Sequence, residues 1–271
     1  MIAYLHGGTA NTLFQYAMGY AQAKRFNEEL LLDVTSFQRD HMRQYTLSLF
    51  PNIKNTLVTG TVPTIHEGQM PYDQALVDRI KPGDCLKGYF QSERYFKQYK
   101  YELQDLFMPG DLTPQTDKMA QKIVNKGQRS VFLTVRRTDY VGNTYHGEMT
   151  MDYYNAALKI ISERVDPYVF VFTDDIPWVR DNFRIPYDME IAGNYDRTTR
   201  DHLGREDEDL FLMSLCPHCV LANSSYSWWG CYLGEEETFN YNKIVIAPEK
   251  WFGPDCHEDP RDVYCSNWIV I

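Results

Sequence analysis

The chain has 271 residues, of which 44% are hydrophobic, and it carries a formal net charge of −10 at pH 7. This length and apolar content suffice to bury a sizeable core in one large or two small domains, so the sequence predicts a globular protein. The negative charge argues against a surface that binds nucleic acid or anionic lipid nonspecifically, although a small basic pocket can still bind one anionic ligand.

The sequence shows no targeting or membrane-spanning segment. Residues 1–14, MIAYLHGGTANTLF, have neither the basic flank nor the long apolar run of a signal peptide, and about 18 consecutive apolar residues occur nowhere. We therefore expect a cytoplasmic protein without a transmembrane segment. Peripheral attachment to a membrane and the oligomeric state stay open.

The chain begins with the pattern of a βαβ unit. Residues 2–5 form a short apolar run, and after the turn HGGTAN the apolar residues of 12–26 recur at helical spacing. Residues 29–34 then predict a second buried strand, so we expect a parallel sheet.

The pattern weakens over residues 63–82. The following stretch CLKGYFQSERYFKQY, residues 85–99, is expected to pass from a strand into an aromatic-rich helix, and residues 112–129 to form a helix with a polar exit. A domain boundary after this helix predicts an N-terminal α/β domain on the acceptor side, residues 1–127, and a C-terminal donor-binding α/β domain, residues 128–271.

The second half alternates strands and helices more clearly. The expected strands are SVFLTV, YVFVFTDD, CVLAN and KIVIAP, and the expected helices are MDYYNAALKIISERV, IPWVRDNF, DEDLFLMSL and SWWGCYLG. Two stacked Rossmann-like α/β units with a cleft between them would produce this series, so we predict an α/β fold.

Cys216 and Cys219 form a Cys-x-x-Cys pair, which could indicate a redox or a metal site. A redox pair places its first thiol at a helix N-terminus, where the dipole lowers the thiol pKa, but Cys216 follows the helix expected at 207–215. The other cysteines and His257 do not repeat the close-pair spacing of structural zinc sites. We therefore expect buried, reduced thiols and no metal site.

An Arg-Arg-Thr-Asp segment follows the strand SVFLTV. Open parallel sheets bind ligands beyond the carboxyl ends of their strands, so two arginines there indicate an anion site. If the strand alternation continues, Arg136 can offer its planar guanidinium to a phosphate while Arg137 pairs with Asp139 or the opposite wall. Ordinary salt bridges of both arginines are the alternative.

Two further strand ends carry polar side chains. Asp174 and Asp175 could bind a metal-diphosphate, accept hydrogen bonds from a base such as guanine, or cap the next helix. The stretch NSSYSWWG brings hydroxyl and backbone N–H groups to a helix start, where an anion is favoured. The residues concerned are Asn223, Ser224, Ser225 and Ser227, while at least one of Trp228 and Trp229 is expected in the core.

These stretches, taken in order, resemble one family over nearly the whole chain. They are GGTANTLFQYAMGYAQA, GYFQSERYF, VRRTDYVG, HGEMTMDYYNAAL, FVFTDDIPWV, DLFLMSLCPHCVLANSSYSWWGCYL and IAPEKWF. The chain is similar to the bacterial-type α-1,2-fucosyltransferases, glycosyltransferase family 11. The resemblance implies a GT-B-like pair of domains and inverting transfer of L-fucose from GDP-β-L-fucose to a glycan hydroxyl, the 2-OH of a terminal galactose, without a metal or other cofactor.

The resemblance also implies site residues. The Arg-Arg-x-Asp segment of the family matches Arg136, Arg137 and Asp139 in the donor half. The NSSYSWWG stretch is implied to lie in the same half. The resemblance also implies that Asp174 or Asp175 recognises guanine. From the first domain, the GGTAN turn is implied to face the cleft with three residues, Gly8, Asn11 and Gln15.

The chain departs from the family pattern at three positions. Thr134 stands where a His is usual, and Thr138 and Ala10 each stand where a Gly is usual. The RRTD segment also resembles α-1,6- and protein O-fucosyltransferases, so another linkage stays open. A catalytically silent protein that binds a nucleotide sugar or a glycan is the alternative that Thr134 suggests.

The expected mechanism is electrostatic. Negative charge grows on the leaving GDP, and Arg136 with the groups near Ser224 and Ser227 can stabilise it more in the transition state than in the ground state. The acceptor hydroxyl loses a proton, for which Glu148, His146 and Asp33 are candidate bases. The catalytic candidates are therefore Arg136, Asp139, Glu148 and His146.

Overall fold

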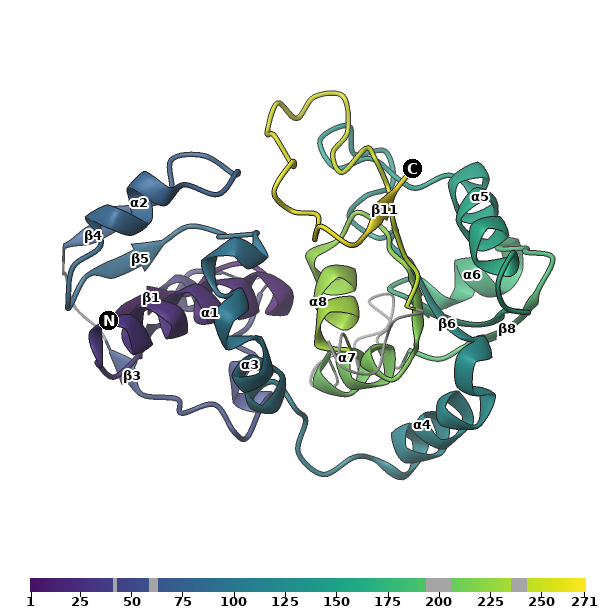
Figure 1. Ribbon diagram of the computed structural model, residues 1–271, viewed down its shortest axis with the longest axis horizontal. Helices are drawn as coiled ribbons and strands as arrows, with labels where there is room; N and C mark the ends of the chain where they lie inside the picture. The colour runs from purple at the N-terminus through teal and green to yellow at the C-terminus, as the bar shows by residue number, and fades with distance from the viewer. Residues whose placement is uncertain (41–42, 59–62, 194–205, 235–242) are drawn as a thin grey trace. The chain divides into compact units, whose positions relative to one another are not determined.

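The fold is that of a computed structural model, which describes residues 1–40, 43–58, 63–193, 206–234 and 243–271 (Figure 1). The chain divides into two compact units. Unit 1 comprises Met1–Gly110 and Glu258–Cys265, and unit 2 comprises Asp111–His257 and Ser266–Ile271. Each unit contains a parallel sheet with helices, which confirms the α/β prediction.

Unit 1 is built on a parallel sheet of short strands. Its order, over the residues described, is β3-β2-β1-β5-β4. These strands are β1 (Ile2–Tyr4), β2 (Leu31–Asp33), β3 (Leu57–Val58), β4 (Thr64–His66) and β5 (Cys85–Lys87). Ile2 is in register with Leu31 on one side and with Cys85 on the other. The strand order therefore reverses between β1 and β5.

Helix α1 (Thr9–Phe26) packs against this sheet and begins three residues before the predicted start. Gly8 is its extended N-cap, and Asn27 ends it in the left-handed region with φ 53°. Gly19 permits the close packing, because a Cβ there would lie 3.0 Å from the Cβ of Ala3.

The prediction of a helix within residues 85–99 is wrong. After β5 the chain forms two 3₁₀ turns, Glu93–Tyr95 and Lys97–Tyr99, before helix α3 (Lys100–Leu106). The buried aromatic residues here are Phe90, Tyr95 and Phe96, whose spacing does not repeat with the period of an α-helix. Unit 1 also contains helix α2 (Gln74–Arg79), in the segment where the pattern is weak.

Unit 2 contains the second parallel sheet, whose described strands follow the order β11-β10-β9-β6-β7-β8. They are β6 (Ser130–Val135), β7 (Tyr168–Thr173), β8 (Asp188–Ile191), β9 (His218–Val220), β10 (Val245–Ala247) and β11 (Ile269–Val270). Strand β6 pairs with β7 along its whole length and with β9 on its other side. All its residues are buried, as expected for a central parallel strand. Here the order reverses between β6 and β9.

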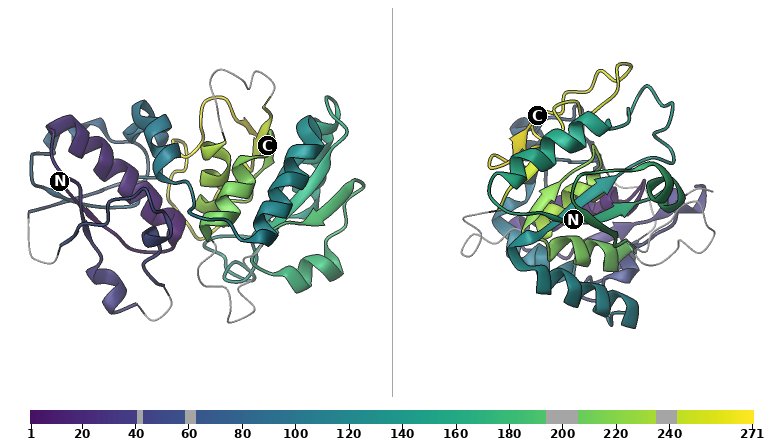
Figure 2. Two further views of the ribbon diagram at one scale, coloured as in Figure 1. Left: turned by 90° about the horizontal axis from the view of Figure 1, so that it is seen from below. Right: turned by 90° about the vertical axis from the view of Figure 1, so that its right-hand side faces the viewer.

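Helices cover both faces of the unit 2 sheet (Figure 2). They are α4 (Pro114–Lys126), α5 (Met151–Ser162), α6 (Ile176–Asn182), α7 (Glu206–Ser214) and α8 (Ser225–Leu233). Val131, Leu133 and Val135 share a core with α5 and α6. The intervening Thr134 faces α8 instead, because its hydroxyl bonds Ser227. The predicted strands and helices of this half are confirmed, while β8 and β11 were not predicted.

The boundary between the units lies at Gly110, before α4, whereas the sequence predicted it after this helix, at residue 127. Helix α4 belongs to unit 2 because its cap is bonded to α7. The backbone N–H of Thr113 donates to Glu208 Oε1 at 2.7 Å, and Thr116 Oγ1 donates to Glu208 Oε2. Likewise, Asp262 joins residues 258–265 to unit 1 by accepting the N–H of Tyr72 at 3.0 Å.

Within the described ranges, no helix combines the length and apolar character required to cross a bilayer.

Candidate functional site

The carboxyl edge of the unit 2 sheet carries most of the predicted site residues. Arg136 directly follows β6, Asp174 directly follows β7, and Ser224 lies between β9 and α8. Ligands of open α/β sheets bind where the strand order reverses, because the loops on either side diverge there. The structure therefore places these residues at the edge where a ligand is expected.

Asp174 is the buried centre of this edge. Its side chain is 3% exposed. Its Oδ1 accepts the backbone N–H of Arg137 at 2.8 Å, and its Oδ2 accepts the hydroxyl of Thr138 at 2.6 Å and the guanidinium of Arg136. All three donors belong to the loop after β6, so Asp174 fixes this loop and has little capacity left to accept hydrogen bonds from a base.

The arginines differ from their expected pairing. Arg136 bonds both Asp139 and Asp174, whereas Arg137 bonds Glu148 at 2.8 Å and stacks on Trp178, with its guanidinium carbon 3.7 Å from the ring centroid. Of the two partners expected for Arg137, Asp139 or the opposite wall, Asp139 pairs with Arg136 instead. Both arginines form salt bridges, which is the alternative stated for them. Strand alternation ends at Val135, and a turn follows in which the N–H groups of residues 140 and 141 bond the Arg137 carbonyl.

Carboxylates outnumber the two arginines at this edge. Asp139, Asp174, Asp175 and Glu148 all lie within salt-bridge distance of a guanidinium. A diphosphate therefore binds favourably only if it replaces one of them. The Asp139 side chain is 41% exposed, and exposed ion pairs are weak, so Asp139 is the partner that Arg136 can exchange.

Asp175 caps helix α6. Its Oδ1 accepts the N–H of Trp178 at 3.0 Å, and its Oδ2 lies 3.5 Å from Arg137 Nε. This is the helix-cap alternative stated for the aspartate pair.

The serines at the start of α8 have different environments. Ser224 is the N-cap and accepts the N–H of Tyr226 at 3.3 Å, while Ser225 is half-buried in the first turn. Ser227 is 1% exposed and donates to Thr134 Oγ1 at 2.7 Å, and Thr134 Oγ1 also accepts the N–H of Ala222 at 2.7 Å. Ser224 and Ser225 therefore remain at the edge, whereas Ser227 joins α8 to β6.

Trp228 and Trp229 are both fully buried, which confirms that at least one of them belongs to the core.

Asn223 holds two loops together. Its Nδ2 donates to the carbonyl oxygens of His146 at 2.8 Å, Gly147 at 3.2 Å and Trp251 at 3.0 Å. Its carbonyl accepts the Tyr140 hydroxyl at 3.2 Å. Asn223 therefore positions the loop that carries His146.

His146 stacks on Tyr140, with ring centroids 4.6 Å apart and an interplanar angle of 9°. Burial lowers the pKa of His146 below 6.5, so its imidazole is neutral at pH 7 and can accept a proton. Glu148 is paired with Arg137 instead. Among the base candidates of unit 2, His146 is therefore the better suited.

The predicted residues of unit 1 lie around the start of α1. Gly8 is the N-cap, and Asn11 Oδ1 accepts Gln91 Nε2 at 2.9 Å. Gln15 is 1% exposed, and its side-chain amide forms hydrogen bonds with the backbone N–H and carbonyl of His6 at 2.9 and 3.2 Å. Gln15 therefore stabilises the turn and does not contact a ligand. Ala10 is 5% exposed, so its methyl group points into the core.

Asp33 closes the turn after β2. Its Oδ1 accepts the backbone N–H and the hydroxyl of Thr35 at 2.9 and 2.6 Å. This bonding gives Asp33 a structural role and makes it a weak candidate for the base.

The cysteine pair has the buried environment that was expected. Cys216 and Cys219 have free thiols and are 1% and 0% exposed. Burial raises the pKa of the Cys216 thiol, which disfavours the reactive thiolate. Among the described residues, His, Cys, Asp and Glu side chains form no cluster of three suited to a metal ion.

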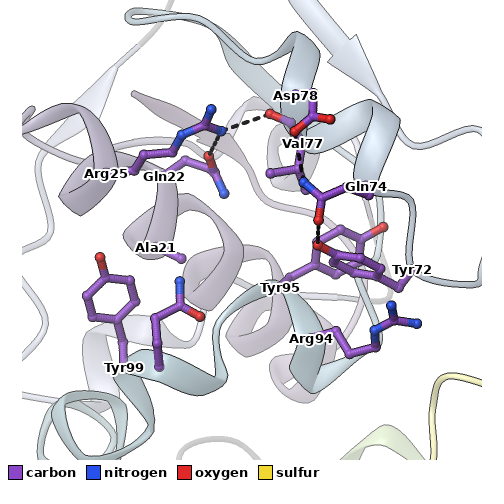
Figure 3. A pocket seen from close by; sticks show the side chains of 11 residues that line it. Ala21, Gln22, Arg25, Tyr72, Gln74, Val77, Asp78, Arg94, Tyr95 and Tyr99 are labelled. Carbon is purple, nitrogen blue, oxygen red and sulfur yellow. Dashed lines mark hydrogen bonds between the residues drawn. The ribbon is translucent and has the colours of Figure 1, made fainter.

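A cavity of about 400 Å³ lies elsewhere in unit 1, between α1 and α2 (Figure 3). Its polar groups bond one another: Arg25 donates to the Val77 carbonyl at 2.9 Å and to Gln22 at 3.2 Å, and Gln74 donates to Asp78 at 2.8 Å. The cavity includes none of the predicted site residues.

Sequence reasoning missed three residues at the carboxyl edge of the unit 1 sheet, His6, Glu67 and Tyr89. Glu67 lies in the segment without a clear pattern. The GYFQ stretch that contains Tyr89 contributed to the family resemblance but carried no chemical signal of its own.

Known proteins resemble the chain in sequence and fold. The alpha-1,2-colitosyltransferase of Escherichia coli is 30% identical, over 93% of this chain and 92% of its own length. The O-antigen biosynthesis glycosyltransferase WbnK of Escherichia coli is 28% identical over the whole of both chains. A mutant of Arabidopsis thaliana FUT1 in complex with GDP has a TM-score of 0.48 at 12% identity, covering 93% of this chain and 72% of that one.

The NodZ α-1,6-fucosyltransferase soaked with GDP-fucose also has a TM-score of 0.48 at 12% identity, covering 86% of this chain and 91% of that one. Residues 73–271 match the family model described as Glycosyl transferase family 11. Because the model covers most of the chain, and a relative 30% identical spans nearly all of it, the chain belongs to glycosyl transferase family 11.

Proposed function

We propose that this glycosyltransferase transfers L-fucose from GDP-β-L-fucose to the 2-hydroxyl of a terminal galactose, with inversion. The observation that supports the donor site most directly is the position of Arg136 and the N-terminus of α8 at the reversal point of the unit 2 sheet. The name of the 30% identical relative supports an α-1,2 linkage. It also makes colitose, which lacks the 3-hydroxyl of fucose, the alternative donor sugar.

The chemical step breaks the bond between sugar C1 and the β-phosphate oxygen and forms a bond between C1 and the acceptor oxygen. The electron pair of the broken bond stays on the phosphate. In our proposal Arg136 exchanges Asp139 for this phosphate, and the positive end of the α8 dipole stabilises its charge. These interactions strengthen as the negative charge grows, so they lower the barrier.

The proton of the acceptor hydroxyl needs an acceptor, which we assign to His146. Its imidazole is neutral at pH 7 because burial lowers its pKa. Asn223 positions the backbone of His146, because its Nδ2 donates a hydrogen bond of 2.8 Å to the His146 carbonyl oxygen. Asp174 acts differently, since it positions Arg136 and the loop after β6.

A catalytically silent binding protein was suggested by Thr134. This side chain is 5% exposed, and its hydroxyl is bonded to Ala222 and Ser227. The position thus supports the packing of β6 on α8, and it gives no specific reason to prefer a silent protein.

Transfer assays with the purified chain test the proposal. GDP-fucose, GDP-colitose, GDP-mannose and UDP-galactose are each offered with a panel of β-galactosides, and product linkage is determined by NMR. We expect acceptor-dependent release of GDP from GDP-fucose and an α-1,2-fucosylated galactoside. Transfer of colitose alone would revise the donor sugar, and GDP binding without transfer to any acceptor would favour the silent protein.

A further inference from the structure

The carboxyl edge of the unit 1 sheet carries a group of side chains that the proposed donor site does not use. His6 follows β1, Glu67 follows β4, and Tyr89 follows β5. The strand order of this sheet reverses between β1 and β5, which is the position where an open α/β sheet binds a ligand.

Glu67 holds the loop after β5. Its Oε2 accepts the backbone N–H of Tyr89 at 2.6 Å, and its Oε1 accepts that of Phe90 at 3.0 Å. Burial raises the pKa of Glu67 to about 7, with a smaller contribution from Glu258 in the same direction, while the two backbone bonds act against the rise. The carboxyl group is thus held in place and titrates near neutrality.

The backbone of this loop is shaped around the carboxyl group. Phe90 has φ 52°, a left-handed conformation that is rare for a bulky residue and costs free energy. Gly88 is required by space, because a Cβ there would lie 2.4 Å from the Cβ of Glu67. A strained residue and a glycine on either side of Tyr89 indicate that its position serves more than packing.

Tyr89 presents an exposed aromatic ring beside these groups. Its side chain is 46% exposed, and its ring centroid lies 4.7 Å from that of His6. Burial lowers the pKa of His6, so the imidazole is neutral at pH 7 and can accept a hydrogen bond. The bond of 2.9 Å between Asn11 and Gln91 ties this loop to the start of α1.

We infer that Tyr89, His6 and Glu67 form a binding site for a galactoside, with the Tyr89 ring against the apolar face of the sugar and the other two side chains accepting hydrogen bonds from its hydroxyl groups. An exposed ring beside hydrogen-bond acceptors suits a neutral polyol. Glu258 adds negative charge beside Glu67 and Lys87 adds positive charge beside His6, so this edge has no excess of one sign that would favour a charged ligand. The role as acceptor site rests on the proposed function, whereas the binding itself does not.

Direct binding of lactose tests the inference without turnover. Saturation-transfer difference NMR compares the wild type with Tyr89→Ala and Glu67→Gln, and Tyr101→Ala is the control because Tyr101 is 51% exposed on α3. We expect both site variants to bind lactose at least tenfold more weakly and the control to bind it normally, with GDP affinity unchanged throughout. The inference is overturned if lactose does not bind the wild type, or if it binds both site variants with the affinity of the wild type.

The pH dependence separates a direct role of Glu67 from a structural one. Among the residues that the structure describes, the charged or titratable groups near Glu67 and His6 include Glu258, Tyr95, Lys87, Tyr4 and Tyr89. Burial dominates the pKa of Glu67. If the ionised carboxylate accepts a hydrogen bond from a sugar hydroxyl, lactose affinity falls as the pH drops through about 7, and Glu67→Gln removes this dependence. An unchanged pH profile in this variant contradicts a direct role.

Two outcomes keep this inference distinct from the proposed function. If Glu67→Gln fails to fold, Tyr89→Ala decides, because the Tyr89 side chain is exposed. A wild type that binds lactose through Tyr89 but transfers no sugar from GDP-fucose refutes the proposed function and supports the site. Fucose transfer with the same kcat/KM for lactose in both site variants and the wild type supports the proposed function and refutes the site.

Discussion

Arg136 is held by two carboxylates that differ in burial, Asp139 at 41% exposure and Asp174 at 3%. Replacement of Asp174 by Asn leaves buried donors poorly satisfied, so we expect Asp174→Asn to lower the free energy of unfolding by about 2–4 kcal/mol. Asp139→Asn should cost less than about 1 kcal/mol, since the pair is exposed. Urea unfolding measures both.

The same variants should differ in GDP affinity. If a phosphate replaces Asp139, Asp139→Asn binds GDP as tightly as the wild type or more tightly, whereas Asp174→Asn binds it at least tenfold more weakly because Arg136 loses its support. A larger loss in Asp139→Asn than in Asp174→Asn would show that Asp139 has a direct role.

His218 provides a pH-dependent contribution to stability. Burial, assisted by Lys243, lowers its pKa from 6.5 to about 4, and its Nδ1 accepts the N–H of Ile244 at 3.1 Å. A lowered pKa stabilises the fold above pH 6.5, and this contribution is lost as the pH falls from 6.5 to 4. The free energy of unfolding should therefore drop by up to about 1.4 kcal/mol per pH unit in this window.

The matched variant is His218→Asn, which keeps an acceptor for the N–H of Ile244 and cannot titrate. Unfolding measured at pH 7 and pH 5 should show a smaller loss in this variant. An equal loss in both proteins would assign the acid sensitivity to other groups.

The position of Arg136 and Arg137 at the carboxyl edge of the unit 2 sheet was predictable from the sequence, because both follow a recognisable buried strand. The pairing of Arg136 with Asp139 was not predicted, because strand alternation stops at Val135 and a turn follows. Glu67 could not be identified at all, because its environment depends on β1, β4 and β5, which are distant in the sequence.

Strand β6 and helix α8 meet at Thr134, whose hydroxyl accepts from Ala222 and Ser227 at 2.7 Å each. Thr134→Val preserves the shape but leaves both donors unsatisfied in a buried site, so we expect a loss of about 2 kcal/mol in unfolding free energy. Thr134→Ser keeps the hydroxyl and should lose about 1 kcal/mol or less. Equal losses in urea unfolding would show that the methyl group, not the hydroxyl, matters.

Elements with a strong local pattern were predictable, and those without one were not. The six-residue strands β6 and β7 match their predicted starts because both are long, buried and flanked by helices. A helix was predicted within the aromatic-rich residues 85–99, but Phe90 adopts a left-handed conformation and the chain turns there. Strand β11 has two residues, too few for a periodic signal.

At the scale of the whole molecule, each unit has a reversal point at the carboxyl edge of a parallel sheet. The sequence predicted two α/β units, because the alternation of strands and helices is local information. It placed their boundary too late and did not show the return of residues 258–265 to unit 1, since Asp262 reaches Tyr72 and Arg94 across a long sequence separation.

The proposed function depends most on a nucleotide site at the edge formed by Arg136 and α8. Isothermal titration of GDP into the wild type, Arg136→Ala and the control Arg129→Ala tests it, because Arg129 precedes β6 at the opposite edge and pairs with Asp166. We predict saturable binding by the wild type and the control, and at least tenfold weaker binding, about 1.4 kcal/mol, by Arg136→Ala. No saturable binding by the wild type, or equal binding by Arg136→Ala, would contradict the account.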